Sequence, residues 1–265
     1  MRRAIGGGEL LALLAGLYPT RQGAATPFAF WKMRALIEGG RGYYLPSSGS
    51  YYLIYHDHLI CHFSPDGACH IPPGELNALG AISLPASAFD PIAGRLDGFE
   101  VHYGWNLRYD FGHRPAAVAG CSAVDFDFSS EGDYALAARI IAGDGGWMTA
   151  KRVARMAAFE AFDPALWFFV RDDATGRRVA VAISAYSPEV RETDLDWIFV
   201  LPEWQGRGVG RFPIGEVIGR CRERSDVVRV GGAVGFYRRC GFVNDALWVW
   251  AVKPGYEFHC PRIQP

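Results

Sequence analysis

The part of the chain with the clearest chemical meaning is a glycine-rich hexapeptide at residues 205–210. It consists of Gln205, Gly206, Arg207, Gly208, Val209 and Gly210. Glycine has no side chain to hold a ligand away from the backbone and accepts a positive φ, so alternate glycines let several N–H groups converge on one anion. A helical pattern follows directly, and a helix N-terminus adds further N–H groups and a positive dipole end. The hexapeptide therefore predicts a phosphate-binding loop, although glycine clusters also mark ordinary loops.

The glycine spacing differs from two common phosphate loops. It lacks the Gly-Lys-Ser/Thr ending of a P-loop, and it does not follow the G-x-G-x-x-G spacing of dinucleotide folds. The longer run at residues 200–210, Val-x-Pro-x-x-Gln-Gly-x-Gly-x-Gly, resembles the coenzyme A pyrophosphate loop of the GNAT N-acetyltransferase superfamily. A second run resembles the late helix of that family, A-x-x-F-Y-x-x-x-G-F, and contains Ala233, Phe236, Tyr237, Gly241 and Phe242. The two runs stand in the order of the family.

The resemblance implies an α/β (α+β) fold for residues 116–265, with a mixed, mostly antiparallel sheet flanked by helices. Residues 1–115 are expected to form an additional N-terminal α/β module that shapes an acceptor site or a homodimer contact. The implied activity is acyl-CoA-dependent N-acyl transfer, with acetyl-CoA as co-substrate and a primary amine, small molecule or peptide, attacking the thioester directly. The alternative is a non-catalytic module that binds or senses acyl-CoA, or a platform for protein interaction.

The resemblance also assigns roles to residues near the hexapeptide. The backbone N–H groups of Phe199 and Val200 are expected to polarise the thioester carbonyl, as the strand before the loop does in the family. Tyr237 matches the tyrosine that faces the sulfur, and a phenol with a pKa of ~10 is protonated at neutral pH and suited to protonate a thiolate. A buried tyrosine with its hydroxyl bonded to backbone is the other interpretation of Tyr237.

Three carboxylates precede the loop and are candidates for taking the proton of the amine. Asp194 and Asp196 are two residues apart and share one face of a regular strand, and Glu192 is close. Each is equally open to recognising a cationic substrate or to capping a strand end. A water chain to bulk solvent would remove the need for a base.

The position of the acceptor is predicted from the family, in which the turn between the first two helices borders the acceptor site. In this chain that turn contains Trp147 and Met148. One departure from the family is Val230, which stands where many relatives have an asparagine that contacts the cofactor.

A cluster of histidines and cysteines in the first half suggests metal binding at first sight. Its members are His56, His58, Cys61, His62, Cys69 and His70. A type I turn at residues 64–67 predicts a hairpin in which His62 faces Cys69 and shares a face with His58, while Cys61 and His70 point the other way. The spacing fits no standard zinc pattern, so no metal is expected.

Composition restricts the class of protein further. The 265 residues include 27 basic and 28 acidic side chains, which gives no electrostatic reason to expect a nucleic acid or an anionic membrane as partner. No run reaches the ~18 apolar residues of a membrane span. Six irregularly spaced cysteines predict reduced thiols and a cytoplasmic protein.

Periodicity and turn signals predict the elements that would position these residues. Helices are expected near the N-terminus and over residues 28–38, 130–141, 149–162 and 235–240, and another is expected after the glycine loop, with Val217, Ile218 and Cys221 facing inward. Strands are expected over residues 124–128, 166–171, 177–186, 194–200, 227–230 and 247–252, after a strand-rich section that begins at residue 50. A linker is expected at residues 112–120. The first half contains no second glycine loop, so two active acetyltransferase domains are not expected.

Overall fold

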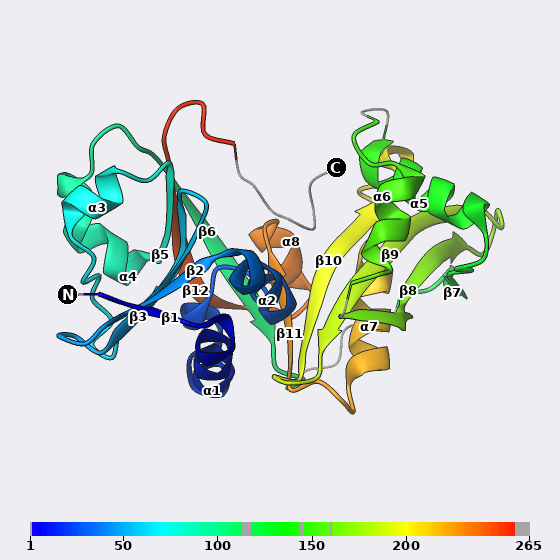
Figure 1. Ribbon diagram of the computed structural model, residues 1–265. Helices are drawn as coiled ribbons and strands as arrows, with labels where there is room; N and C mark the ends of the chain where they lie inside the picture. Colours follow the sequence, from blue (N-terminus) through cyan, green and yellow to red (C-terminus); the bar gives the residue numbers. More distant parts are fainter. Residues whose placement is uncertain (1, 113–117, 144–145, 160, 258–265) are drawn as a thin grey trace. The chain divides into compact units, whose positions relative to one another are not determined.

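The structure is a computed structural model that describes residues 2–112, 118–143, 146–159 and 161–257 (Figure 1). The chain divides into two compact units. One unit combines Met1–Leu107 with the segment from Asn244 onward, and the other is Arg108–Val243. Residues 113–117 of the linker expected at 112–120 lie outside the described residues.

The first unit is a sheet with helices. Its strands, in sheet order, are β1 (Arg3–Ile5), β2 (Arg41–Leu45), β3 (Ser50–Tyr55), β4 (His58–Phe63), β5 (Ala81–Pro85), β12 (Val243–Val252) and β6 (Glu100–Tyr109). Its helices are α1 (Gly7–Ala25), α2 (Phe30–Gly39), α3 (Pro73–Asn77), α4 (Ala86–Phe89) and the 3-10 helix η1 (Asp90–Arg95). β4 and β5 are parallel, whereas β1–β2, β2–β3, β3–β4 and β5–β12 are antiparallel.

The second unit has the same mixed character. Its strands, in sheet order, are β7 (Cys121–Asp125), β8 (Phe162–Asp172), β9 (Arg178–Ser187), β10 (Glu192–Val200) and β11 (Val227–Gly231). Its helices are α5 (Glu131–Ala142), α6 (Ala150–Met156), the 3-10 helix η3 (Pro202–Trp204), α7 (Arg211–Cys221) and α8 (Val234–Arg239). The strands from β7 to β10 pair antiparallel and β10–β11 is parallel, which confirms the predicted mostly antiparallel α/β fold.

Helices α5 and α7 cover opposite faces of the second sheet. Phe168 and Phe169 are adjacent in β8 and therefore point to opposite faces. Arg178 lies over the Phe169 ring at 4.9 Å and pairs with Asp133 of α5 at 2.5 Å. Arg220 of α7 lies over the Phe168 ring at 4.5 Å. Both rings are fully buried, so the core lies on both sides of the sheet.

Local sequence signals explain where the helices of the second unit begin and end. Ser130 caps α5 by accepting the N–H of Asp133 at 3.3 Å. Thr149 caps α6 in the same way through Arg152. Helix α6 ends at Met156, earlier than the predicted 162, because Phe162 already begins β8.

The hairpin predicted around residues 64–67 is wrong. β4 pairs with β3 through a turn at residues 55–58, and residues 68–71 form no strand. A register shift between Leu53 and Ile54 also places His62 opposite Tyr52 but His58 opposite Tyr55. The two histidines therefore lie on opposite faces of the sheet, not on a shared face. A bulge changes the alternation of side chains, and the sequence of the strand carries no sign of it.

The final strand belongs to the first unit. β12 pairs antiparallel with β5, with Val249 opposite Leu84. From the sequence, all of residues 116–265 were expected to form one domain, whereas the segment from Asn244 is part of the first unit. Trp248, Val249 and Ala251 are fully buried. Burial of these apolar side chains explains why the strand pairs here despite its distance in sequence.

The order of elements along the chain occurs twice. A strand, two helices, three strands, a helix, a strand, further helical turns and a strand run from β1 to β6, and the same order runs from β7 to β12. In both halves the third of the three consecutive strands pairs parallel with the strand that follows the helix. The loop after β4 therefore corresponds in order to the glycine loop after β10.

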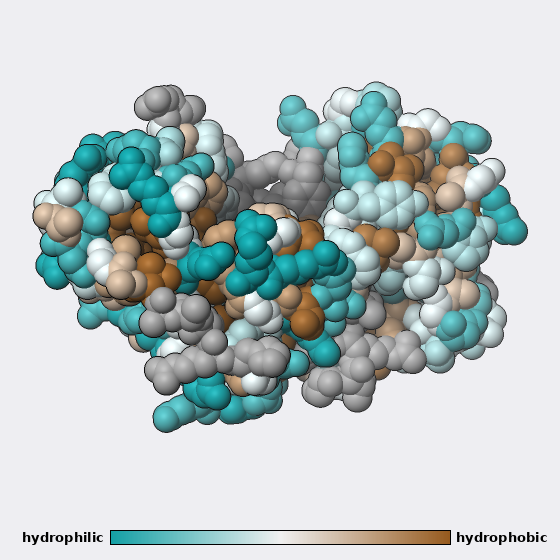
Figure 2. All heavy atoms as spheres, turned by 180° about the vertical axis from the view of Figure 1, so that it is seen from behind, coloured by the Kyte–Doolittle hydropathy of each residue, from teal (hydrophilic) through white to brown (hydrophobic). Residues whose placement is uncertain are grey.

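The described cysteines, Cys61, Cys69, Cys121, Cys221 and Cys240, are all free thiols. Among the helices in the described part of the chain, none is long and apolar enough to cross a membrane. The surface in Figure 2 mixes hydrophilic and hydrophobic residues, in keeping with the near-balanced net charge of -1.

Candidate functional site

The glycine loop follows β10 and leads into α7, as the sequence predicts. Gly206 and Gly208 have positive φ values of 74° and 83°, and a Cβ added to either would meet no atom within 4 Å. Gly210 has an ordinary φ, but a Cβ there would lie 3.3 Å from the Phe236 ring. Two glycines thus permit the turn and leave open space, and the third allows close packing against α8.

The loop presents open hydrogen-bond donors. Arg211 and Phe212 begin α7 by donating to the carbonyl oxygens of Gly208 and Val209, both at 3.0 Å. Within the residues that the structure describes, the five backbone N–H groups of residues 206–210 have no acceptor. Five open donors directly before a helix N-terminus, with open space at two glycines, fit the pyrophosphate of a coenzyme A thioester.

The side chains of the loop support this arrangement from outside. Gln205 Nε2 donates to the carbonyl oxygen of Val200 at 3.0 Å and thereby holds the loop against the end of β10. The Arg207 guanidinium lies over the Trp204 ring at 5.1 Å. Val209 is buried and anchors the loop. Arg207 and Arg211 keep positive charge on either side of the open donors.

The end of β10 distinguishes the two predicted carbonyl-polarising N–H groups. Leu201 donates its N–H to Val179 of β9 at 2.9 Å. N–H groups alternate between the two edges of a strand, so the N–H of Phe199 also points toward β9. The N–H of Val200 points to the other edge, where β10 pairs with β11 only over Glu192–Asp194. The N–H of Val200 is therefore placed to bind a ligand, whereas Phe199 can contact a ligand only through its side chain.

A bulge in β10 separates the two predicted aspartates. Leu195 is opposite Ser184 and Trp197 is opposite Ile183, so Asp196 is the additional residue of the bulge. The prediction that Asp194 and Asp196 share one face of a regular strand is therefore wrong. Asp194 is 6% exposed and Asp196 is half-buried.

Glu192 has a structural environment. It is 1% exposed and its carboxylate lies 3.9 Å from the guanidinium of Arg229, itself 3% exposed. Removing one partner of such a buried pair leaves an uncompensated charge and is strongly destabilising. We therefore leave Glu192 out of the candidate catalytic groups.

Tyr237 lies in α8, beside the loop and the bulged strand. Its ring packs against Phe236 and Phe242, with centroid distances of 5.1 and 5.5 Å. Burial first, then Cys240 and Asp194, raise the pKa of Tyr237 to about 12. Among the described residues its hydroxyl has no hydrogen-bond partner, which argues against the interpretation that the backbone holds it.

Trp147 and Met148, predicted to border the acceptor, precede α6. Trp147 is 44% exposed and its ring lies 5.6 Å from that of Trp197 in β10, whereas Met148 is buried. The Arg152 side chain donates to the carbonyl oxygen of Trp147 and fixes its backbone. The sequence did not lead us to expect that Trp197 and Phe236 pack at the site. For Trp197, the aromatic residues in the strand that leads to the glycine loop were a signal that could have indicated this.

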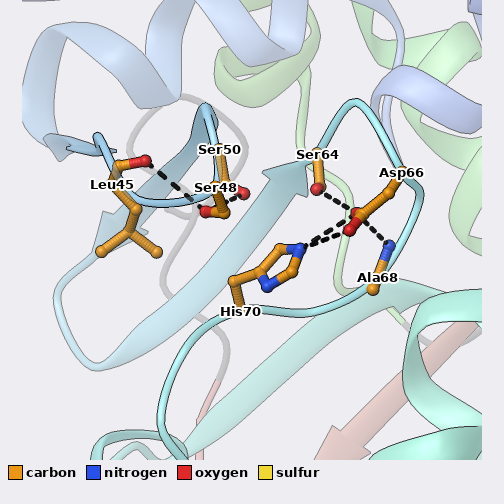
Figure 3. A network of polar contacts seen from close by, with 7 residues as sticks. All are labelled: Leu45, Ser48, Ser50, Ser64, Asp66, Ala68 and His70. Carbon is orange, nitrogen blue, oxygen red and sulfur yellow. Dashed lines mark hydrogen bonds and ion pairs between the residues drawn. The ribbon is translucent and has the colours of Figure 1, made fainter.

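The histidine and cysteine cluster does not assemble into a metal site. His58 Nε2 pairs with Ser83 Oγ at 2.8 Å, and burial lowers the pKa of His58 to about 4. His70 bonds to Asp66, which also accepts from Ser64 and from the backbone of Ala68 (Figure 3). Within the described ranges, no three histidine, cysteine, aspartate or glutamate side chains are grouped to hold a metal ion.

Comparison with known proteins agrees with the fold and with the loop. Residues 163–244 match the acetyltransferase (GNAT) domain. No match to the sequence is found among the curated proteins. Residues 163–244 are therefore a GNAT acetyltransferase domain, and the superfamily predicted from the two runs is confirmed. At the level of the family, an acyl-CoA-dependent N-acetyltransferase is supported.

Solved structures of similar fold cover nearly the whole chain. A GCN5-related N-acetyltransferase from Sphaerobacter thermophilus is 17% identical, with a TM-score of 0.65 and coverage of 97% of each chain. Another from Kribbella flavida is 18% identical, with a TM-score of 0.59 and coverage of 89% of this chain and 97% of that one. A tandem GNAT protein from the clavulanic acid biosynthesis pathway is 14% identical, with a TM-score of 0.56 and coverage of 97% and 99%.

Proposed function

We propose that the chain is an N-acetyltransferase that moves the acetyl group of acetyl-CoA to a primary amine by direct attack on the thioester. The observation that carries this proposal is the set of five open N–H groups at residues 206–210, together with the unbonded hydroxyl of Tyr237, a mostly buried tyrosine in α8. A non-catalytic acyl-CoA-binding module needs the first feature but has no use for the second.

Acetyl-CoA supplies an activated acetyl group and a thiol leaving group. The open N–H groups at 206–210 hold its pyrophosphate, and the N–H of Val200 donates to the thioester carbonyl, where negative charge develops. The neutral amine forms a C–N bond to the carbonyl carbon as the C–S bond breaks. Tyr237 protonates the departing thiolate, and Asp194 or a water beside it receives the proton that the amine loses.

The raised pKa of Tyr237 bears on this role. A phenol with a pKa of about 12 is fully protonated at neutral pH and so carries the proton that the thiolate needs. Burial raises the pKa of a thiol as well, as it does for Cys61 to about 12. When a phenol and a thiol share one desolvated site, burial raises both pKa values. The two values are therefore closer to each other than the pKa values of a buried phenol and an exposed thiol.

The test is calorimetric titration of the chain with acetyl-CoA, using Gly208→Glu beside Gly176→Glu. Both glycines have positive φ values, 83° and 69°, and open space around an added Cβ, so both substitutions carry similar backbone strain. Only Gly208 lies in the loop, where a carboxylate would repel a pyrophosphate and occupy its space.

We expect wild type and Gly176→Glu to bind acetyl-CoA alike and Gly208→Glu to lose at least about 100-fold in affinity, which corresponds to about 2.7 kcal/mol. Thiol release with a panel of amines then separates catalysis from binding. Binding without thiol release for any amine would favour the non-catalytic module. Equal binding by the two glycine variants would refute the loop as the site.

A further inference from the structure

Three aromatic side chains form a continuous row on the second unit. Trp147 contacts Trp197 at a ring-centroid distance of 5.6 Å. Trp197 in turn stacks on Phe199 at 6.1 Å, with an interplanar angle of 25°. We call Trp147, Trp197 and Phe199 the aromatic row. It runs along β10 toward Val200, the residue that leads into the glycine loop.

The bulge at Asp196 puts the aromatic row and Asp194 on one face. Asp194, Trp197 and Phe199 lie opposite residues 185, 183 and 181 of β9, which alternate along that strand. Directly opposed residues point to the same face of a sheet. Val181 is also opposite Phe169, whose ring lies on the α5 side. A regular strand would have placed Asp194 with Ile198 and kept it away from Trp197.

The aromatic row is accessible, unlike the aromatic core of the second unit. Trp147 is 44% exposed and Trp197 and Phe199 are partly exposed, whereas Phe168 and Phe169 are fully buried. The Trp147 backbone is also fixed, because Arg152 donates to its carbonyl oxygen and the cap of α6 follows two residues later. A rigid, exposed aromatic surface is suited to bind a flat apolar group at low entropic cost.

Negative charge on the same face indicates which chemical group the ligand carries besides a flat apolar one. Asp194 belongs to this face and is 6% exposed, and the half-buried Asp196 is the bulge residue between Leu195 and Trp197. Carboxylates attract an ammonium group, and aromatic faces attract both aromatic rings and cations. We propose that the acyl acceptor is a small primary amine that carries an aromatic ring, with the ring against the aromatic row and the amine on the side of Asp194.

This inference rests on the proposed acetyltransferase activity and narrows its substrate class. The test compares 2-phenylethylamine with butylamine, which offers a similar apolar length without a ring. The readouts are kcat/KM from thiol release in the presence of acetyl-CoA and direct calorimetric binding of each amine to the CoA-bound chain. We expect kcat/KM for 2-phenylethylamine to exceed that for butylamine by about tenfold or more.

Variants of Trp147 connect this preference to the aromatic row. Trp147→Ala should reduce the preference to about twofold or less by raising KM for 2-phenylethylamine, with acetyl-CoA affinity unchanged. Trp147→Phe, which keeps a flat ring, should retain most of the preference. Tyr103→Ala, which removes a 55% exposed aromatic side chain of the first unit, is the matched control and should change neither quantity.

Each of the following results supports or contradicts one of the two proposals. Turnover of butylamine as good as that of 2-phenylethylamine, or a preference that survives Trp147→Ala, would overturn the inference and leave the acetyltransferase proposal intact. Absence of calorimetric binding of 2-phenylethylamine to the CoA-bound chain would overturn it equally. Failure of acetyl-CoA to bind, with no thiol release for any amine, would instead refute the proposed function. In that case, saturable binding of 2-phenylethylamine to the chain, abolished by Trp147→Ala, would still support the aromatic site.

Discussion

Tyr237 combines burial, proximity to Asp194 and a hydroxyl with no partner among the described residues. Tyr237→Phe removes only that hydroxyl, so we expect kcat to fall by about 100-fold while the Kd for acetyl-CoA stays the same. Steady-state kinetics and calorimetry measure the two quantities. Tyr186→Phe is a matched control, because the Tyr186 hydroxyl donates to the Arg224 carbonyl oxygen at 2.9 Å and serves packing. Unchanged kcat in Tyr237→Phe would remove the assignment.

The pH dependence of Tyr237 follows from its raised pKa. The phenol holds its proton until the pH approaches about 12, so its ionisation should cause no loss of kcat between pH 7 and about 10. An increase of rate with pH in that range should report deprotonation of the amine substrate. A fall of kcat near pH 9 in wild type that disappears in Tyr237→Phe would contradict the raised pKa.

At the scale of elements, the bulge in β10 determines which side chains face the acceptor. Deletion of Asp196 should leave Trp197 opposite Ile183 and Leu195 opposite Ser184, because the bulge residue is the additional one. We expect the variant to unfold cooperatively in urea but to lose kcat by about tenfold or more, because the bend and twist that the bulge gives β10 between Asp194 and the loop are lost. Asp196→Asn retains the bulge and is the control. Equal kcat in the deletion and in Asp196→Asn would show that the bulge has no role in catalysis.

At the scale of the whole molecule, the repeated element order raises the question of a second cofactor site. In the first unit the loop that corresponds to the glycine loop contains Asp66, whose carboxylate accepts hydrogen bonds from Ser64, Ala68 and His70 (Figure 3). These bonds hold the pKa of Asp66 well below its usual range. The Asp66 carboxylate thus already accepts hydrogen bonds from three residues of that loop. In addition, Pro72 and Pro73 lack N–H groups at the start of α3.

We therefore expect one acetyl-CoA per chain. Calorimetric titration of a known concentration of active chain measures the stoichiometry. Gly208→Glu, which alters only the loop after β10, should abolish the single binding event. A stoichiometry of two in wild type, or a residual event of full affinity in Gly208→Glu, would contradict this expectation.

Stability should fall in mild acid. His58 and His62 are 3% and 4% exposed, and mainly burial lowers the pKa of each to about 4. An unfolded histidine has a pKa near 6.5, so unfolding takes up protons once the pH is below that value. The stabilisation is present above pH 6.5 and is lost as the pH falls toward 4, by about 3 kcal/mol for each histidine.

Urea unfolding at pH 7 and at pH 5 measures this effect. In His58→Gln, which preserves a polar partner for Ser83, the difference between the two pH values should be smaller by roughly half. An equal free energy of unfolding at pH 7 and pH 5 in wild type would show that the two histidines are not held neutral by burial.

The sequence by itself predicted the features that depend on contiguous residues. The glycine loop, the Phe-Tyr helix and most helices and strands of the second unit are local patterns of residue type and spacing. Local backbone conformation and side-chain bonds to neighbouring N–H groups determine these features, so a window of about ten residues contains the needed information.

The tertiary structure alone decided how side chains from separate strands combine. The bulges in β3–β4 and β10 shift the alternation of side chains, separating His58 from His62 and joining Asp194 to Trp197 and Phe199. The pairing of β12 with β5 and the packing of Trp147 on Trp197 likewise join residues distant in sequence. Register depends on the packing of whole strands against their neighbours, and a bulge changes it at a cost that no short segment of sequence reveals.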